Sequence, residues 1–251
     1  MRTFCFVSHK GGVGKTTLAA ALTASAADLG LRAGVLDLDA STQGLSDFVA
    51  LRLDKGLPAP ELLPPPLWPR TRTPSSRDAS AAIREATDMA RAKGVDLLLI
   101  DLEAVSHALW LKAAACLAAD TVITPVSDSP LDLRAVLTGA GRGELAEFVD
   151  AAGQHRPDWV VVRNRTAHLR TRLSEDLAAR MAAGEGRGGY RLLDGLKDRV
   201  AYREMFETGR SPLDPRATGR LSMSMLSARS EMRRLASDLL AAPRIRLLSV
   251  A

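Results

Sequence analysis

The sequence has 251 residues, of which 46% are hydrophobic and 25% are charged. These values are ordinary for a globular protein, and they exclude collagen-like, low-complexity and disordered classes. No apolar run approaches the roughly 18 residues that a membrane span needs, and the N-terminal segment does not resemble a signal peptide. We therefore expect a cytoplasmic protein without stable membrane insertion. The formal net charge of +5 permits an acidic partner but does not require one.

Short apolar runs alternate with helical patterns along the chain. The runs predict strands at Thr3–Val7, Ala33–Leu36, Val95–Ile100, Thr121–Pro125 and Trp159–Val162. The helical patterns cover Lys15–Leu29, Arg77–Lys93, Val105–Ala118, Leu131–Ala152, Leu169–Ala183 and Ser222–Ala241. This alternation favours an α/β fold with a mostly parallel central sheet and helices on both faces. Because no clean domain boundary is visible, we expect residues 1–251 to form one domain.

Two segments interrupt this pattern. Residues 55–76 contain seven prolines, so we expect a long loop or extended arm there. Gly184–Gly189 is rich in glycine and predicts a turn. The two cysteines, Cys5 and Cys116, are too few for a disulfide framework and fit no metal spacing, so both are expected to be buried thiols.

The strongest signal is the segment KGGVGKTT, which starts at Lys10 between the first predicted strand and the first predicted helix. Its glycines let backbone N–H groups turn inward toward phosphate oxygens, and the helix that follows presents its positive end to an anion. Lys15 can reach the β- and γ-phosphates, and the Thr16 hydroxyl can bind Mg²⁺. The residues predicted to bind the nucleotide are Gly11, Gly12, Val13, Gly14, Lys15, Thr16 and Thr17.

The same segment departs from the standard phosphate loop, since His9 stands where its first glycine would be. In this form it resembles the deviant Walker A motif of the ParA/MinD ATPases, which have a Rossmann-like P-loop fold. The resemblance implies ATP and Mg²⁺ as cofactors. It also implies that Lys10 reaches across an ATP-dependent homodimer to the nucleotide of the partner, in a catalytic role with Lys15.

Three aspartates match further positions of this family. Asp37-Leu38-Asp39 follows the second predicted strand and resembles the family's D-x-D motif. By that resemblance Asp39 helps to place the attacking water, and Asp37 lies near the metal. Asp101, after the VDLLLI strand, resembles the Walker B aspartate that holds a Mg²⁺-bound water. A structural role in a turn or cap is the alternative for each of them.

Segments further along the chain narrow the resemblance. DWVVVRNR starts at Asp158 and LKDRVAYREMF starts at Leu196, and in this order they resemble the MipZ branch, which positions the division plane. That branch implies an ATP-driven dimer that binds DNA without sequence preference, associates with the nucleoid, and interacts with ParB and FtsZ. Asn164 matches a family asparagine near the base, and a turn-forming asparagine is the alternative.

Arginines in these segments are the predicted DNA-binding residues. They could neutralise phosphates without reading bases, whereas a solvated surface is the alternative. They are Arg163, Arg165, Arg170, Arg172, Arg199 and Arg203.

One departure from the family is pronounced. After the Walker B aspartate the family usually has T-P-G-G, whereas this chain reads Leu102-Glu103-Ala104. The missing glycines and the added carboxylate predict slow hydrolysis and weak sensing of the γ-phosphate. Two other interpretations remain open: a ParA-type ATPase that partitions a plasmid or a cellular cargo, and a scaffold that binds ATP without hydrolysing it.

Overall fold

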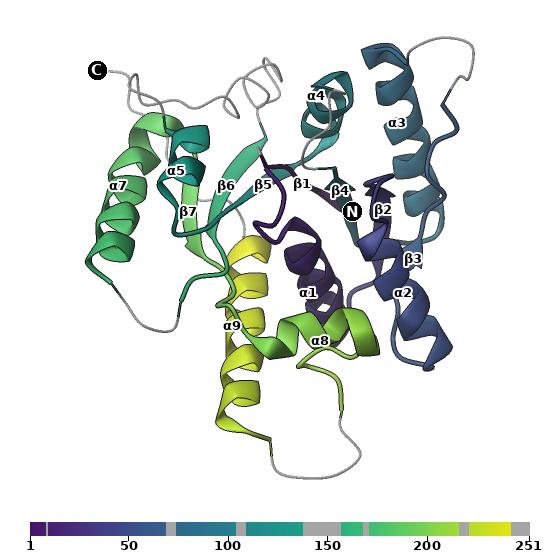
Figure 1. Ribbon diagram of the computed structural model, residues 1–251. Coiled ribbons are helices and arrows are strands. Elements are labelled where there is room, and N and C mark those ends of the chain that lie inside the picture. Colours follow the sequence, from purple (N-terminus) through teal and green to yellow (C-terminus); the bar gives the residue numbers. More distant parts are fainter. Residues whose placement is uncertain are drawn as a thin grey trace.

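The computed structural model describes residues 1–8, 10–68, 74–103, 109–137, 157–167, 171–215 and 221–241. All the strands in these ranges belong to one sheet (Figure 1). In chain order they are β1 (Arg2–Phe6), β2 (Ala33–Leu38), β3 (Glu61–Leu62), β4 (Leu97–Leu102), β5 (Thr121–Val126), β6 (Asp158–Arg163) and β7 (Arg191–Asp194).

The sheet has the strand order β3-β2-β4-β1-β5-β6-β7, and every pairing is parallel. The α/β, Rossmann-like prediction is therefore confirmed. In the register, Phe6 and Asp37 both pair with Asp101, so β1, β2 and β4 end at the same level. Open parallel sheets bind ligands outside the carboxyl ends of their strands, and this edge is where the phosphate loop follows β1.

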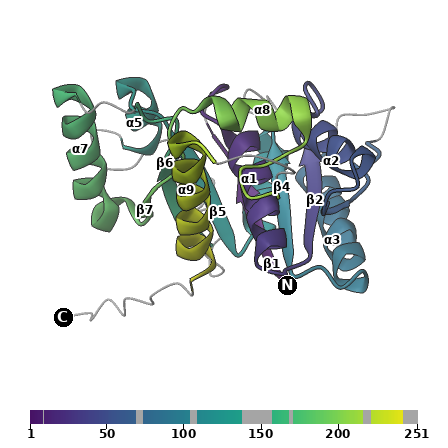
Figure 2. The ribbon, with the colours of Figure 1, turned by 90° about the horizontal axis from the view of Figure 1, so that it is seen from below.

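Helices cover both faces of the sheet (Figures 1 and 2). One face carries α1, α2, α8 and α9, and the other carries α3, α4, α5 and α7. Their bounds are α1 (Lys15–Asp28), α2 (Gly44–Asp54), α3 (Ser76–Ala92), α4 (Leu109–Ala118), α5 (Pro130–Val136), α7 (Arg172–Gly188), α8 (Val200–Thr208) and α9 (Met223–Leu240).

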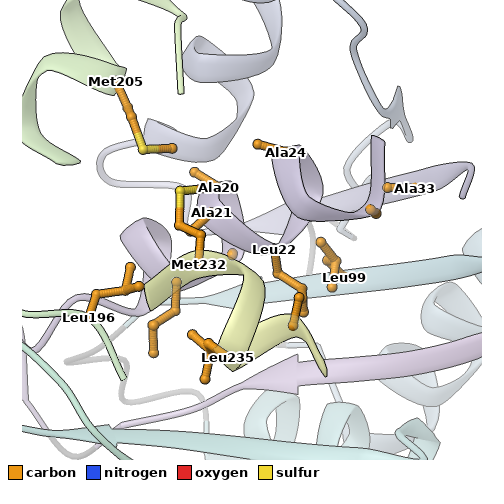
Figure 3. Packing of buried hydrophobic residues seen from close by; sticks show 14 of the residues in the cluster. Ala20, Ala21, Leu22, Ala24, Ala33, Leu99, Leu196, Met205, Met232 and Leu235 are labelled. Carbon is orange, nitrogen blue, oxygen red and sulfur yellow. The ribbon is translucent and has the colours of Figure 1, made fainter. Parts of the chain in front are cut away.

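Small side chains allow α1 to lie deep in the core. Ala20, Ala21 and Ala24 are buried on this helix, and Met232 and Leu235 of α9 pack in the same cluster (Figure 3). A helix that is apolar on all sides belongs inside a protein, and α1 is covered by the sheet on one side and by α9 on another. This burial holds the first turn of α1 firmly, and that turn begins at Lys15 of the phosphate loop.

Four elements were not predicted. They are α2, β3, β7 and α8. Helix α2 has Leu45, Phe48, Val49 and Arg52 on its buried face, but an arginine in that pattern conceals its 3.6-residue period. Strand β3 has two residues and lies inside the proline-rich segment, whose other described residues between α2 and α3 form no helix or strand, as expected for a loop or extended arm.

Two predicted boundaries also differ. Gly184–Gly189 is not a turn, because α7 continues to Gly188 and ends where Gly189 adopts a left-handed conformation with φ 70°. The predicted helix Leu131–Ala152 does not run unbroken, since α5 stops at Val136 and Leu137 is extended. The rest of that range, and the start of the predicted helix Val105–Ala118, lie outside the described residues.

Candidate nucleotide-binding site

The phosphate loop connects the end of β1 to the start of α1 at the carboxyl edge of the sheet. Gly12 and Gly14 have φ values of 77° and 91°, which favour glycine. A Cβ atom on Gly14 would lie only 2.4 Å from the Asn164 side chain, so two independent constraints require glycine there. The loop therefore has a defined shape that its sequence and its neighbour both enforce.

Lys15 begins α1 and is only 7% exposed. Burial lowers the pKa of its ammonium group, and the negative charges of Asp101, Asp39 and Glu103 act in the opposite direction. A cation held at the positive end of a helix is electrostatically unfavourable unless an anion joins it. This position therefore favours the binding of a phosphate group.

Asp101 lies at the end of β4 and is 1% exposed. Neither of its carboxylate oxygens has a hydrogen-bond partner within the described residues. Burial raises the pKa of this carboxyl to about 7, although the Thr16 hydroxyl and Lys15 favour its charged form. Buried polar groups normally have partners, so an unpaired carboxylate at the edge of a sheet is a strong indication of a binding site.

The oxygens near this carboxylate fit a magnesium ion. Mg²⁺ prefers hard oxygen ligands, keeps several waters and takes only one or two protein carboxylates beside substrate phosphates. The Asp101 carboxylate and the Thr16 hydroxyl are such ligands. The described part of the chain contains no group of three or more His, Cys, Asp or Glu residues that could hold a metal ion. The ion would therefore need phosphate and water oxygens to complete its shell.

Asp37 and Asp39 shape the backbone that follows β2. The Asp37 carboxylate accepts hydrogen bonds from the backbone N–H of Asp39 and from the N–H and hydroxyl of Ser46 in α2. Asp39 accepts bonds from Ser41 and Thr42. Burial raises the pKa of Asp39, but these bonds outweigh it and the net shift is downward. Both carboxylates act as caps, which is the structural alternative named for them, and their metal and catalytic roles stay predictions.

Lys10 projects from the phosphate loop and is half-exposed. Its Nζ lies 2.5 Å from Oδ1 of Asp132, near the start of α5. The other oxygen of Asp132 accepts bonds from the Ser127 N–H and hydroxyl, so the carboxylate is fixed in place. Lys10 is thus held against its own chain in this structure. Lys10 is half-exposed, so water can solvate its ammonium group when it leaves this pair, whereas the Asp132 carboxylate is buried.

Asn164 is fully buried at the end of β6. Its Nδ2 donates to the Val13 carbonyl at 2.9 Å, and its Oδ1 accepts from the Leu196 N–H at 3.1 Å. The amide therefore joins the phosphate loop to the segment after β7. Contact with adenine stays a prediction, since both ends of the amide have partners within the chain.

A cavity of about 590 Å³ is lined by most of the predicted phosphate-loop residues and by a second wall, whereas Lys10, Asp37 and Asp101 are not among its lining residues. One side consists of the phosphate loop with Asp39 and Glu103, and the other is formed by residues 196–199 and α8. Sequence analysis missed Ser41, Thr42, Tyr202 and Phe206, which also line it. Tyr202 and Phe206 lie in the segment LKDRVAYREMF, whose pattern was the available signal.

The predicted DNA-binding arginines that the structure describes differ in burial and in partners. Arg163 contacts Asp128 at 3.0 Å and Asp194 at 3.5 Å. Arg199 is 9% exposed and pairs with Glu231 at 2.6 Å, so its expected contact with DNA is incompatible with this structure. Its guanidinium is neutralised by the Glu231 carboxylate between the start of α8 and α9.

The remaining three predicted arginines that are described lie elsewhere. Arg172 is exposed at the start of α7, and Arg203 is exposed on α8. Arg165 lies over the phosphate loop and donates to the Gly12 carbonyl. Arg170 lies outside the described residues. Arg172 is therefore exposed on α7, whereas the exposed Arg203 lines the same cavity as the loop and lies 3.8 Å from Asp198, the carboxylate that Arg165 also approaches.

The parallel sheet and the loop between β1 and α1 define the P-loop fold that MinD- and ParA-type ATPases share. A family model described as ATPase MipZ matches residues 2–140 and 143–242, and the chain belongs to this family. A comparison with curated protein sequences finds no match. Within the described residues, no helix is long and apolar enough to cross a membrane.

Solved structures with the same fold have low sequence identity. The chain is similar to MinD in the MinC:MinD cell division protein complex of Aquifex aeolicus, with 16% identity, a TM-score of 0.63, and coverage of 96% of this chain and 97% of that one. It is also similar to apo McdA from Cyanthece, with 16% identity, a TM-score of 0.65 and coverage of 96% and 99%. It is similar as well to a putative plasmid partition protein from Borrelia burgdorferi B31 bound to AMPPNP, with 14% identity, a TM-score of 0.65, and coverage of 94% of this chain and 99% of that one.

Proposed function

We propose that this protein is an ATP-dependent dimerisation switch of the MipZ type, with Mg²⁺ as its metal ion. The observation that carries the proposal is the phosphate loop, with Lys15 buried beside the unpaired carboxylate of Asp101. When a Mg²⁺–nucleotide binds, the buried carboxylate gains the partners that it lacks, and the buried ammonium group gains phosphate oxygens. Relatives named in the comparisons include a partition protein bound to AMPPNP, which supports the same ligand class.

Lys10 supports dimerisation as the response to ATP. It is half-exposed and extends from the loop away from the interior cavity wall, toward α5. A lysine that leaves Asp132 could contact a phosphate of a second protomer. The expected dimer therefore contains two nucleotides between two phosphate loops, with each Lys10 acting on the partner's nucleotide.

The test separates binding from dimerisation. Lys15→Ala should abolish detectable ATP binding in calorimetry, because each hydrogen bond to a charged group contributes roughly 1.5–3 kcal/mol. Lys10→Ala should bind ATP nearly as well as the wild type but should stay monomeric in light scattering. ATP-induced dimers of Lys10→Ala would refute the trans role, and absence of ATP binding by the wild type would refute the whole proposal.

Hydrolysis is proposed to be slow. Glu103 lines the cavity and places a carboxylate where the family's T-P-G-G has its proline, close to the expected γ-phosphate. Glu103→Gly should therefore raise steady-state turnover and shorten the lifetime of the dimer after ATP is depleted. Unchanged values for both would show that Glu103 does not slow hydrolysis, whereas no detectable turnover in either protein would favour the second candidate, a scaffold that uses ATP only as a structural ligand.

The dimer is proposed to bind DNA without sequence preference, and so to associate with the nucleoid while it acts in positioning cell division. Arg172 and Arg203 support this proposal because their side chains are exposed, and a dimer presents twice as many of these arginines to one DNA duplex. Each phosphate neutralised adds about 0.9 to the slope of log affinity against log salt. Measured slopes for wild type, Arg172→Ala and Arg203→Ala with ATP test it, and lack of binding at low salt would refute it.

A ParB-like protein and FtsZ are the proposed protein partners, and partition of another cargo is the alternative.

A further inference from the structure

The guanidinium of Arg165 lies on the phosphate loop. Its Nη1 donates to the Gly12 carbonyl at 2.5 Å. The adjacent residue, Asn164, donates to the next carbonyl of the loop, that of Val13. Two successive side chains at the end of β6 thus hold two successive carbonyls of the phosphate loop.

The backbone at Arg165 is unusual. Its φ of 55° lies in the left-handed region, where a non-glycine residue is uncommon and costs free energy. The conformation is held by the Arg165 N–H, which donates to the Leu196 carbonyl at 2.7 Å. Such strain persists where the surroundings over-determine it, and it often marks a functional position. Here it directs the side chain back over the glycines.

The contact has a consequence for the opposite face of the loop. In a phosphate loop the backbone N–H groups point inward to the anion, so the carbonyls of the same peptides must point outward. Outward carbonyls held by Arg165 and Asn164 keep the N–H groups converging before any nucleotide is present. The Cγ atom of the Arg165 side chain also lies 3.6 Å from the position that a Cβ atom on Gly14 would occupy. The side chain therefore packs against the loop as well as donating a hydrogen bond to it.

We propose that Arg165 is a positioning residue of the nucleotide site, which preorganises the phosphate loop by holding the Gly12 carbonyl. This inference rests on the proposed function, since it assumes that the loop binds a nucleotide. Preorganisation avoids ordering the loop at the moment of binding, so it raises affinity without a direct contact to the ligand. Arg165 remains 48% exposed, and its nearest carboxylate is that of Asp198 at 3.8 Å, so no strong ion pair competes for it.

The test uses Arg165→Gly, which removes the side chain and at the same time relieves the left-handed backbone. The variant should therefore fold at least as well as the wild type in urea denaturation. Its affinity for ATP and for ADP should fall by about tenfold or more in calorimetry. Hydrogen exchange of the backbone N–H groups of residues 10–17 should become faster in the protein without nucleotide.

Two further variants make the result specific. Arg210→Ala removes another exposed guanidinium that donates to a backbone carbonyl, that of Pro215, remote from the loop. It should change neither affinity nor exchange in the loop. Arg165→Lys keeps the charge but loses the planar fork, and it should recover only part of the affinity.

The outcomes distinguish this inference from the proposed function. If the wild type binds no nucleotide, the proposed function fails. If the wild type binds and Arg165→Gly binds equally well, the inference alone fails. Weaker binding with unchanged exchange of the nucleotide-free loop would also overturn it, because Arg165 would then act by touching the ligand. Full recovery in Arg165→Lys would contradict positioning through the fork.

Discussion

At the carboxyl edge of the sheet, Asp101 is buried without a hydrogen-bond partner among the described residues, whereas the equally buried Arg52 of α2 donates hydrogen bonds from all three of its nitrogen atoms. Arg52 makes two bonds to Asp214, at 2.7 and 2.9 Å, and bonds to the carbonyls of Pro58 and Gly209. A second network joins Arg199, Tyr202 and Glu231 in the same helical layer.

The two regions differ in whether a buried charge has partners within the fold. Arg52 and Asp214 have such partners, whereas Asp101 lacks them and is the group expected to bind a ligand. Hydrogen bonds from Arg52 and Ser211 keep the pKa of Asp214 below its usual value despite burial, whereas burial dominates at Asp101 and raises its pKa. A charge with fixed partners stabilises one structure and is costly to disturb. A charge without partners reduces stability until a ligand binds, and it is therefore evidence for a site.

The largest expected effect comes from breaking a satisfied pair. Asp214→Asn leaves the Arg52 guanidinium buried without a counter-charge, and breaking a buried pair in this way costs about 3–5 kcal/mol. Urea denaturation should show this loss of unfolding free energy. Asp28→Asn is the control, because its partner Arg233 is exposed and such pairs contribute at most about 1 kcal/mol. Equal losses in both variants would remove the distinction between the two regions.

Replacing Asp101 is expected to increase the unfolding free energy, whereas replacing Asp214 decreases it. Its raised pKa means that the folded protein holds a proton which the unfolded chain releases above pH 3.8, so stability falls as pH rises from about 4 to 7. Asp101→Asn removes this loss and should stabilise the nucleotide-free protein by about 2–4 kcal/mol at pH 8. Denaturation without Mg²⁺ at pH 5 and pH 8 measures it. A gain that does not grow with pH would contradict the interpretation.

A substitution at Gly14 tests the binding region through backbone strain and a steric clash, without changing any charge. Gly14→Ala places a Cβ against Asn164 at a φ of 91°, which should cost about 1–3 kcal/mol and abolish tight ATP binding. Gly56→Ala has a similar left-handed φ of 60° but open space around it, so it reports the conformational part alone. Thermal denaturation of the two variants should differ by the cost of the clash, and equal losses would show that Asn164 yields freely.

The smallest stability change is expected at Lys10. The lysine side of its pair with Asp132 is half-exposed, and the buried Asp132 carboxylate keeps its hydrogen bonds from Ser127, so Lys10→Ala should change the unfolding free energy by only about 1 kcal/mol. A loss of ATP-dependent dimers accompanied by such a small change would show that this charge serves assembly rather than folding. Urea denaturation gives the first quantity and light scattering with ATP gives the second.

The sequence by itself determined the chemistry of the phosphate loop and the class of fold. Glycines, Lys15 and Thr16 between an apolar strand and an Ala-rich helix allow few other readings, because spacing and residue type together specify a phosphate site. Continuous apolar runs such as that of β4 likewise predict buried parallel strands without knowledge of their neighbours. These are local properties, and a single sequence contains them.

Only the tertiary structure decided which charges have partners. Arg165 and Arg199 look alike in the sequence, yet one lies on the phosphate loop and the other is paired in the core with Glu231, 32 residues further along the chain. Helix α2 escaped prediction for a related reason, because its buried Arg52 is neutralised by Asp214, which is 162 residues away. A charge can be buried only when its partner arrives through folding, so burial of charge is a property of the assembled chain.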